Sequence, residues 1–461
     1  MAQLNDLSAT ELLALYAQGE ASPLEACRAF VAHIERWEPQ LCATYAFDPE
    51  GALAQAAAST QRWLARTPQG ALDGVPVLLK ENIATRDVPM PLGSAASLLT
   101  PQPHDAPPAA RLREAGAVFL GKTTMPDYGM LSSGLSSFHK LTRNPWNPAT
   151  NPGGSSAGAG AAAAAGYAPL NLGTDIGGSI RLPAAWCGVF GLKPSLGRIP
   201  IQPPFAGRVA GPMTRTVTDA ALLMQVLSQP DWRDAMSLPH QDIAWLDLER
   251  PVRGLCIGLQ LDAGWGLAVD PEISHAVRAA AHILERQGAQ VAELAPYITR
   301  GMIDGLDQFW RMRSHLDIVA LPPERRARIL PYILDWVAPA AQYSAAAVFN
   351  GYSQMAAMRD AAVAACQPFD FVLSPVAPIA SYPAALAAPS NDAQRPFEHI
   401  AFTVAFNMSE QPSASINCGY TEGGTPIGLQ ITGRRHDDLG VLRLARAWEQ
   451  LRPAQRPWPQ P

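Results

Sequence analysis

The sequence feature that most constrains the fold is a segment of small residues at positions 152–192. It contains two glycine-serine clusters, at residues 153–156 and 177–179, and residues 157–166 between them are almost entirely alanine and glycine. A helix of such residues has a thin surface that can be packed on every side, and glycine adopts backbone dihedral angles that other residues cannot. The apolar run at 167–174 predicts a short strand that leads into the second cluster. We therefore expect a compact unit that presents two serines on turns.

Two other interpretations of this segment do not involve catalysis. Glycine-serine stretches are often flexible linkers, which are polar throughout. This segment is interleaved with apolar residues such as Leu172, Ile180 and Phe190, and a linker is therefore disfavoured. A phosphate-binding glycine loop requires a basic residue directed at the loop, and Arg181 is the only near candidate. The two clusters therefore favour a catalytic role for their serines.

The order of these motifs resembles that of the amidase signature family of serine hydrolases. The serine of GTDIGGSIR follows the first serine of GGSS after 24 positions, and the sequence continues as PAAWCGVFGLKPSLGRIP. Upstream, residues 74–82 read GVPVLLKEN and match the segment that contains the family's catalytic lysine. Further matches are GKTTMP at 121–126, RNPWN at 143–147 and GLQI at 428–431. The resemblance extends over about residues 4–228 and 398–450 and is weak between them.

The resemblance implies an α/β protein with the amidase signature fold, a large central mixed and twisted sheet with helices on both faces. It also implies a single amidase domain over residues 1–461, with a signature core at about 70–230 and 398–450. In this family substrate selectivity varies in the weakly matching region, here the helical segment at about 296–390. The hydrophobic pattern itself alternates between helices and short apolar strands, which favours a layered α/β fold. Predicted strands lie at 75–79, 117–120, 256–259, 291–294, 371–375 and 428–432.

Amide hydrolysis requires a nucleophile, a proton carrier and donors for the oxyanion of the tetrahedral intermediate. Ser179 suits the nucleophile because it ends a glycine loop that can present its hydroxyl. The backbone N–H groups of Ile176, Gly177, Gly178 and Ser179 form a run of donors, which the resemblance identifies as the oxyanion hole. No histidine lies in a motif typical of a nucleophile-base pair. We therefore predict that Lys80 is the base, since burial at the end of an apolar strand would lower its pKa.

The family resemblance implies the remaining residues of the catalytic site. It assigns the family's second serine to Ser155, which it holds through a cis peptide bond after Gly154. Neutral Lys80 would take a proton from Ser155, which in turn takes one from Ser179. Supporting roles around this triad are predicted for Ser156, Asp175 and Arg181. Substrate contacts are predicted for Gly129, Met130 and Ser132.

The predicted reaction is cleavage of carboxylic amide C–N bonds through an acyl-enzyme on Ser179. Aromatic residues of the middle segment, among them Phe309, Trp310 and Trp336, favour apolar or aryl amides, with carbamates or esters as further substrates. The alternatives are an amidotransferase A-type subunit that works in a complex, which the same fold also serves, and an inactive binding protein. An intact set of Lys80, Ser155 and Ser179 argues against the inactive protein.

Composition limits the other function classes. The net charge is −5, the sequence contains no basic run, and nucleic-acid binding is therefore disfavoured. The six cysteines are scattered without metal-binding spacing, so we expect no metal, no disulfide framework and a reducing compartment. The first residues lack the apolar core of a signal peptide, and no apolar run is long enough to span a membrane. We expect a cytoplasmic enzyme without cofactor that acts on a small molecule, and a homodimer is one option.

One motif resembles a nucleotide-binding loop by its letters alone. Residues 116–123 match GxxxxGK[ST], but the intervening AVFL has the pattern of an apolar strand, and Pro126 would interrupt a following helix. A phosphate loop follows a strand and leads into a helix, so an NTPase is disfavoured. At the other end of the chain, the proline-rich residues 452–461 predict an extended, poorly ordered tail.

Overall fold

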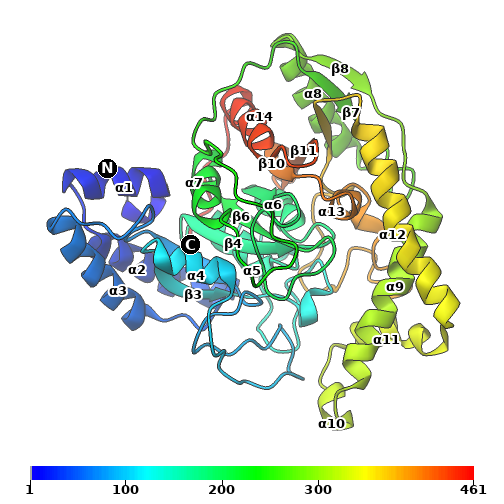
Figure 1. Cartoon of the computed structure of the whole chain (residues 1–461), viewed down its shortest axis with the longest axis horizontal. Helices are drawn as coiled ribbons and strands as arrows, with labels where there is room; N and C mark the ends of the chain where they lie inside the picture. The colour runs from blue at the N-terminus through cyan, green and yellow to red at the C-terminus, as the bar shows by residue number, and fades with distance from the viewer. Residues whose placement is uncertain (1–2) are drawn as a thin grey trace.

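The computed structural model describes residues 3–461, and one mixed sheet of eleven strands forms its centre. The strands follow the spatial order β1-β3-β2-β4-β6-β5-β10-β11-β9-β7-β8 (Figure 1). Strand β2 is parallel to both of its neighbours, whereas β5, β6, β10 and β11 pair antiparallel. This sheet confirms the predicted α/β fold. The strands are β1 (Thr44–Tyr45), β2 (Pro76–Lys80), β3 (Val118–Thr123), β4 (Leu170–Asp175), β5 (Phe190–Lys193), β6 (Val209–Thr214), β7 (Cys256–Leu259), β8 (Gln290–Glu293), β9 (Phe371–Pro375), β10 (Ser413–Tyr420) and β11 (Pro426–Gly433).

Helices cover both faces of the sheet, as predicted. Along β2, Val77 and Leu79 belong to an apolar cluster that also contains residues of α4, α7, α8 and α14, whereas Leu78 between them belongs to a second cluster with residues of α2 and α5. Strand β2 therefore separates two apolar layers. The α-helices are α1 (Ala9–Gln18), α2 (Pro23–Leu41), α3 (Pro49–Leu64), α4 (Pro107–Glu114), α5 (Ala157–Ala165), α6 (Arg181–Cys187), α7 (Val217–Leu227), α8 (Pro271–Arg286), α9 (Arg300–Val319), α10 (Pro323–Arg326), α11 (Pro331–Val337), α12 (Ala345–Cys366), α13 (Val404–Met408) and α14 (Asp438–Leu451).

The small-residue segment forms the innermost part of the fold. All nine residues of α5 are buried, and β4 follows it in the middle of the sheet. A Cβ atom on Gly158 would lie 2.3 Å from the Ala43 carbonyl oxygen and 2.4 Å from the Thr124 nitrogen. Such distances are too short for any side chain, so only glycine allows α5 to approach the neighbouring backbone. The prediction of a thin helix that is packed on every side is confirmed.

The region at about 296–390 is largely helical. Helices α9 and α12 run beside each other at the edge of the molecule (Figure 1). They cross where Gly305 faces Gly351, because a Cβ atom on Gly351 would lie 2.6 Å from the Gly305 carbonyl oxygen. Together with α11 they pack on α6 and α13 through a second apolar cluster that contains Trp186, Trp310 and Trp336. This packing places α9 next to the end of β4.

The structure extends or corrects several predicted boundaries. Helix α2 continues through Pro39 to Leu41, and β3 continues through Lys122 to Thr123. The C-terminal residues 452–461 form no helix or strand, but they are not a free tail. The Trp458 ring lies 6.1 Å from the Trp146 ring and stacks at 4.7 Å on the Arg215 guanidinium. Within residues 3–461, no helix combines the length and the apolar character that crossing a membrane requires.

Candidate active site

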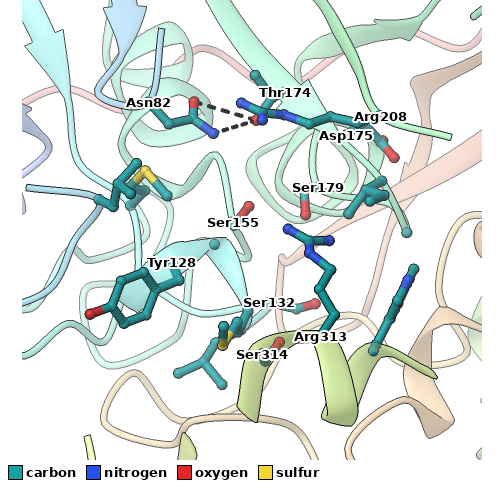
Figure 2. A pocket seen from close by; sticks show the side chains of 18 of the residues that line it. Asn82, Tyr128, Ser132, Ser155, Thr174, Asp175, Ser179, Arg208, Arg313 and Ser314 are labelled. Carbon is teal, nitrogen blue, oxygen red and sulfur yellow. Dashed lines mark hydrogen bonds between the residues drawn. The ribbon is translucent and has the colours of Figure 1, made fainter. Parts of the chain in front are cut away.

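Two of the three predicted catalytic residues, Ser155 and Ser179, line one cavity at an edge of the sheet, and Lys80 is bonded to Ser155. Parallel strands β2 and β4 end side by side, so that Lys80 and Asp175 emerge at the same edge. Ser155 precedes α5, and Ser179 lies in the loop before α6. Figure 2 shows both serine hydroxyl groups at a cavity of about 220 Å³. The small-residue unit therefore brings two turns and two strand ends to one place.

Lys80 is completely buried at this edge. Its Nζ lies 2.7 Å from Ser155 Oγ and 3.0 Å from Thr174 Oγ1, and Thr174 is also bonded to Asn82. No carboxylate of residues 3–461 lies within ion-pair distance of this Nζ. Burial, reinforced by the nearby Arg208 charge, holds the pKa of Lys80 well below its ordinary value. Burial therefore shifts this amine toward its neutral form, which can accept a proton.

Ser155 and Ser179 are connected through the backbone. The Gly154–Ser155 peptide bond is cis, as the resemblance implied. Ser156 N donates to Ser179 O at 3.1 Å, and Ser156 Oγ donates to Thr174 O at 3.1 Å while it accepts from Thr174 N at 3.2 Å. Ser156 therefore fixes the two serine turns to each other and to β4. Among residues 3–461, no direct hydrogen bond joins the hydroxyl groups of Ser155 and Ser179.

The loop between β4 and α6 is held by the buried Asp175 carboxylate. Gly178 N donates to Asp175 Oδ1 at 2.8 Å, and Ile180 N donates to Asp175 Oδ2 at 3.0 Å. Ile176 and Gly177 line the cavity, whereas Gly178 does not. The prediction that Gly178 is an oxyanion donor therefore needs correction, because its N–H group already has a partner that orders the loop.

Arg181 connects this loop to distant parts of the chain. Its guanidinium pairs with Asp175 at 3.0 Å and donates to Asn407 Oδ1 at 2.6 Å and Gln430 Oε1 at 2.9 Å. Burial alone would raise the pKa of Asp175, but the Arg181 charge and the donated hydrogen bonds outweigh it and lower this pKa. The pair thus stays ionised beneath Ser179. Asn407 and Gln430 were not identified from the sequence, although Gln430 lies inside the recognised GLQI block.

The remaining predicted contacts also line the cavity. Gly129, Met130 and Ser132 form part of one wall. The sequence predicts Trp310 and Trp336 only as aromatic residues of a helical region, and the structure adds them to the cavity lining. Asn82, Met125 and Thr174 also line the cavity and lie inside the recognised motifs, although no site role is predicted for them. No local pattern gives a signal for the rest of the lining: Leu92, Tyr128, Leu131, Arg208, Arg313, Ser314, Asp317, Phe397 and Ile400.

Lys122, the lysine of the GxxxxGK[ST] match, lies outside this cavity and has a structural role. Lys122 is buried in β3, and its Nζ donates to the Ile83 carbonyl oxygen and, at 2.6 Å, to Thr85 Oγ1. The GxxxxGK[ST] match is therefore a strand and not a phosphate loop. In the part of the chain that the structure describes, no three His, Cys, Asp or Glu side chains gather in a geometry suited to a metal ion.

Comparison with known proteins then identifies the family. The sequence model of the family described as Amidase matches residues 25–442 of this chain. The chain belongs to the amidase family. An acylamidase from Rhodococcus erythropolis is 32% identical to this amidase over 462 residues, which cover 98% of this chain and 96% of the relative. The A-type subunit of the glutamyl-tRNA(Gln) amidotransferase of Myxococcus xanthus strain DK1622 is 37% identical over 480 residues, 97% of each chain.

Solved structures agree with this assignment. The crystal structure of a bacterial aryl acylamidase, an amidase signature enzyme, superimposes on this amidase with a TM-score of 0.90 at 31% identity and covers 96% of both chains. The fold and the family recognised from the sequence are therefore confirmed, and this chain is an enzyme of the amidase family.

Proposed function

We propose that this amidase hydrolyses carboxylic amides through an acyl-enzyme on Ser179. The observation that carries the proposal is the buried Lys80 amine, which has no counter-ion within residues 3–461 and lies 2.7 Å from Ser155 Oγ. A buried amine without a counter-ion favours its neutral, basic form. Ser155 and Ser179 face the same cavity, so the second serine is placed to pass a proton between the lysine and the nucleophile.

In the proposed first half of the reaction, Lys80 takes the hydroxyl proton of Ser155 while Ser155 Oγ takes that of Ser179. Ser179 Oγ then forms a bond to the carbonyl carbon. The N–H groups of Ile176, Gly177 and Ser179 stabilise the resulting oxyanion, and Gly178 keeps their loop in place. When the C–N bond breaks, the proton returns through Ser155 to the leaving nitrogen, and the amine departs.

In the second half, water replaces the amine. It passes a proton to the same relay, attacks the ester on Ser179, and releases a carboxylic acid with a restored Ser179 hydroxyl. The relay works in both directions because Ser155 is both donor and acceptor. Carbamates and esters place the same carbonyl before the nucleophile, so they are included in the proposed substrate range.

An aromatic wall supports a preference for apolar or aryl groups. Trp310 and Trp336 pack edge-on against Phe397, with ring centroids 5.3 Å and 5.8 Å apart. A Cβ atom on Gly177 would lie 3.4 Å from the Trp310 ring, so this wall begins beside the proposed oxyanion donors. A flat apolar group attached to the reacting amide can be buried there.

A second candidate is an amidotransferase component that works in a complex. It is favoured by the similarity to the Myxococcus xanthus protein, 37% identical over 97% of each chain. A component of this kind would release ammonia inside a complex and would show little activity toward simple amides on its own. Hydrolysis of any member of a panel of acyl anilides, with and without a carboxylate, by the purified chain would support the free-standing hydrolase. Inactivity toward the whole panel with intact labelling of Ser179 would support the amidotransferase component.

The direct test uses a fluorophosphonate probe, followed by mass spectrometry of the labelled peptide. We expect the label on Ser179, and we expect Lys80→Ala to lose it. Labelling and turnover should both increase with pH until Lys80 is neutral, because the pKa of this amine lies below its ordinary value. Lys140→Ala is the matched control, since Lys140 is exposed. A folded wild-type protein that takes no label would refute the acyl-enzyme.

A further inference from the structure

Two arginines enter the cavity from opposite sides. Arg208 directly precedes β6, and Arg313 lies on α9 in the helical region. Both line the cavity that contains Ser155 and Ser179. Figure 2 shows the Arg313 side chain extending from α9 into the cavity. Its guanidinium stacks on the Phe205 ring, 4.2 Å from the ring centroid, which holds the charge in position without neutralising it.

Neither guanidinium has an anionic partner among residues 3–461, and neither donates a side-chain hydrogen bond there. Arg311, two positions before Arg313, shows the contrast, because it pairs with Asp307 at 2.8 Å. The cavity also contains two carboxylates. Asp175 is already paired with Arg181, and Asp317, on the same helix as Arg313, lies outside ion-pair distance of either arginine. The cavity wall therefore has an excess of positive charge.

Two unpaired guanidinium groups at one cavity are electrostatically unfavourable. Arg208 is half-buried, and burial together with the Arg313 charge lowers the pKa of Arg208 to about 10. A buried cation is normally paired, and two cations without partners at one site repel each other. An anion between them would remove both penalties. A planar carboxylate fits best, because the guanidinium fork donates two parallel hydrogen bonds to its oxygens.

We propose that Arg208 and Arg313 form an anion subsite that binds a carboxylate of the amide substrate. The proposal rests on the hydrolase function proposed for the same cavity and narrows its substrate class. The substrate would combine an apolar or aryl part, held by the aromatic wall, with a carboxylate held by the two arginines. That carboxylate can belong to the amine part, as in an N-acyl amino acid, or to the acyl part, as in the anilide of a dicarboxylic acid.

The subsite also explains how the enzyme would reject neutral amides. A ligand that fills the cavity without an anion displaces water from two guanidinium groups and leaves them unpaired, which costs more than a missing apolar contact. Binding of the anion therefore discriminates by charge, whereas the aromatic wall discriminates by shape.

The test is a binding measurement that does not depend on turnover. Ser179→Ala protein is titrated by calorimetry with N-benzoylglycine, with glutaranilic acid, and with the methyl ester of each. We expect at least one acid to bind roughly tenfold to hundredfold more tightly than its ester, and the better acid tells which part of the substrate bears the carboxylate. Arg208→Gln and Arg313→Gln should bring that ratio close to one, and Arg313→Lys should restore part of it.

A matched control and a second readout separate the two proposals. Arg28→Gln removes an exposed arginine on α2 and should leave the acid-to-ester ratio unchanged. A ratio of one in the Ser179→Ala protein, or a high ratio that survives both glutamine variants, would overturn the anion subsite. Fluorophosphonate labelling of wild-type Ser179 is scored in parallel. If Ser179 is labelled but the acid binds no better than its ester, the hydrolase proposal holds and the anion subsite is refuted. If the acid binds better but Ser179 takes no label, the anion subsite holds and the acyl-enzyme is refuted.

Discussion

Replacing Lys80 by methionine is expected to stabilise the folded protein at neutral pH while it removes the proposed base. Lys80 is fully buried, and its pKa in the folded state lies well below the ordinary value. The unfolded chain holds the proton up to its ordinary pKa, so folding requires deprotonation of the amine. Methionine has a similar length and no charge, and it avoids this cost.

The cost has an upper limit that follows from the pH alone, because the limit is reached when the amine of the folded protein is fully deprotonated. Releasing a proton from an ordinary lysine costs about 4.6 kcal/mol at pH 7 and about 1.9 kcal/mol at pH 9. The variant loses the contacts with Ser155 and Thr174, about 1 kcal/mol each. The net gain is therefore at most about 2.6 kcal/mol at pH 7 and close to zero at pH 9. With 461 residues and an unfolding entropy of about 2.1 cal/mol/K per residue, this limit corresponds to a Tm increase of about 3 °C at pH 7.

The assay is differential scanning fluorimetry of both proteins between pH 7 and pH 9. The sign is fixed by linkage: the folded state binds fewer protons, so wild-type stability rises with pH and the advantage of Lys80→Met shrinks. Lys140→Met is the matched control, because this lysine is exposed and should give a difference that does not depend on pH. A variant that is less stable than wild type at pH 7, or a difference that is independent of pH, would refute a neutral buried lysine.

Two further predictions concern the loop that carries Ser179. Arg181→Met leaves the buried Asp175 carboxylate without its partner and should cost about 3–5 kcal/mol, seen as a lower Tm; an unchanged Tm would contradict this account. Gly178→Ala places a Cβ atom 2.6 Å from Thr403 Oγ1, so the loop must shift and turnover should fall roughly tenfold to hundredfold in a folded protein. Gly301→Ala, whose nearest neighbour is 3.9 Å away, is the control, and equal activity of the two variants would contradict the expected loop displacement.

The sequence predicts the parts of the site that local patterns encode. Lys80 ends an apolar strand, and the two serines lie in glycine turns at either end of one small-residue unit, so each has a local signal. The partners of Arg181 have none, because Asn407 and Gln430 lie more than two hundred positions away and join it only through the folded sheet. For the same reason no pattern could distinguish Arg208 and Arg313 from ordinary surface arginines.

Strands β6 and β10 were not predicted from the sequence, and the reasons are physical. Strand β6 contains Gly211 and Pro212, two residue types that are depleted in strands. Strand β10 alternates small polar residues with apolar ones, and its apolar positions Ala414, Ile416 and Cys418 face a single layer. Its serines face the other side, where α6 leaves little space. Gly178 illustrates a further limit, since a glycine loop is visible in a sequence but the direction of its N–H groups is not.

The position of the last two strands has a consequence for how the enzyme is made. Strands β10 and β11 lie in the middle of the sheet, between β5 and β9. Arg181 is bonded to Gln430 on β11 and to Asn407 on α13, the helix that precedes β10. A chain grows from its N-terminus and its early parts fold first. A ribosome-bound chain can therefore expose Lys80 and Ser179 long before the loop around them is fixed. We therefore expect an incomplete chain to lack the ordered Ser179 loop and to stay inactive without a separate inhibitor.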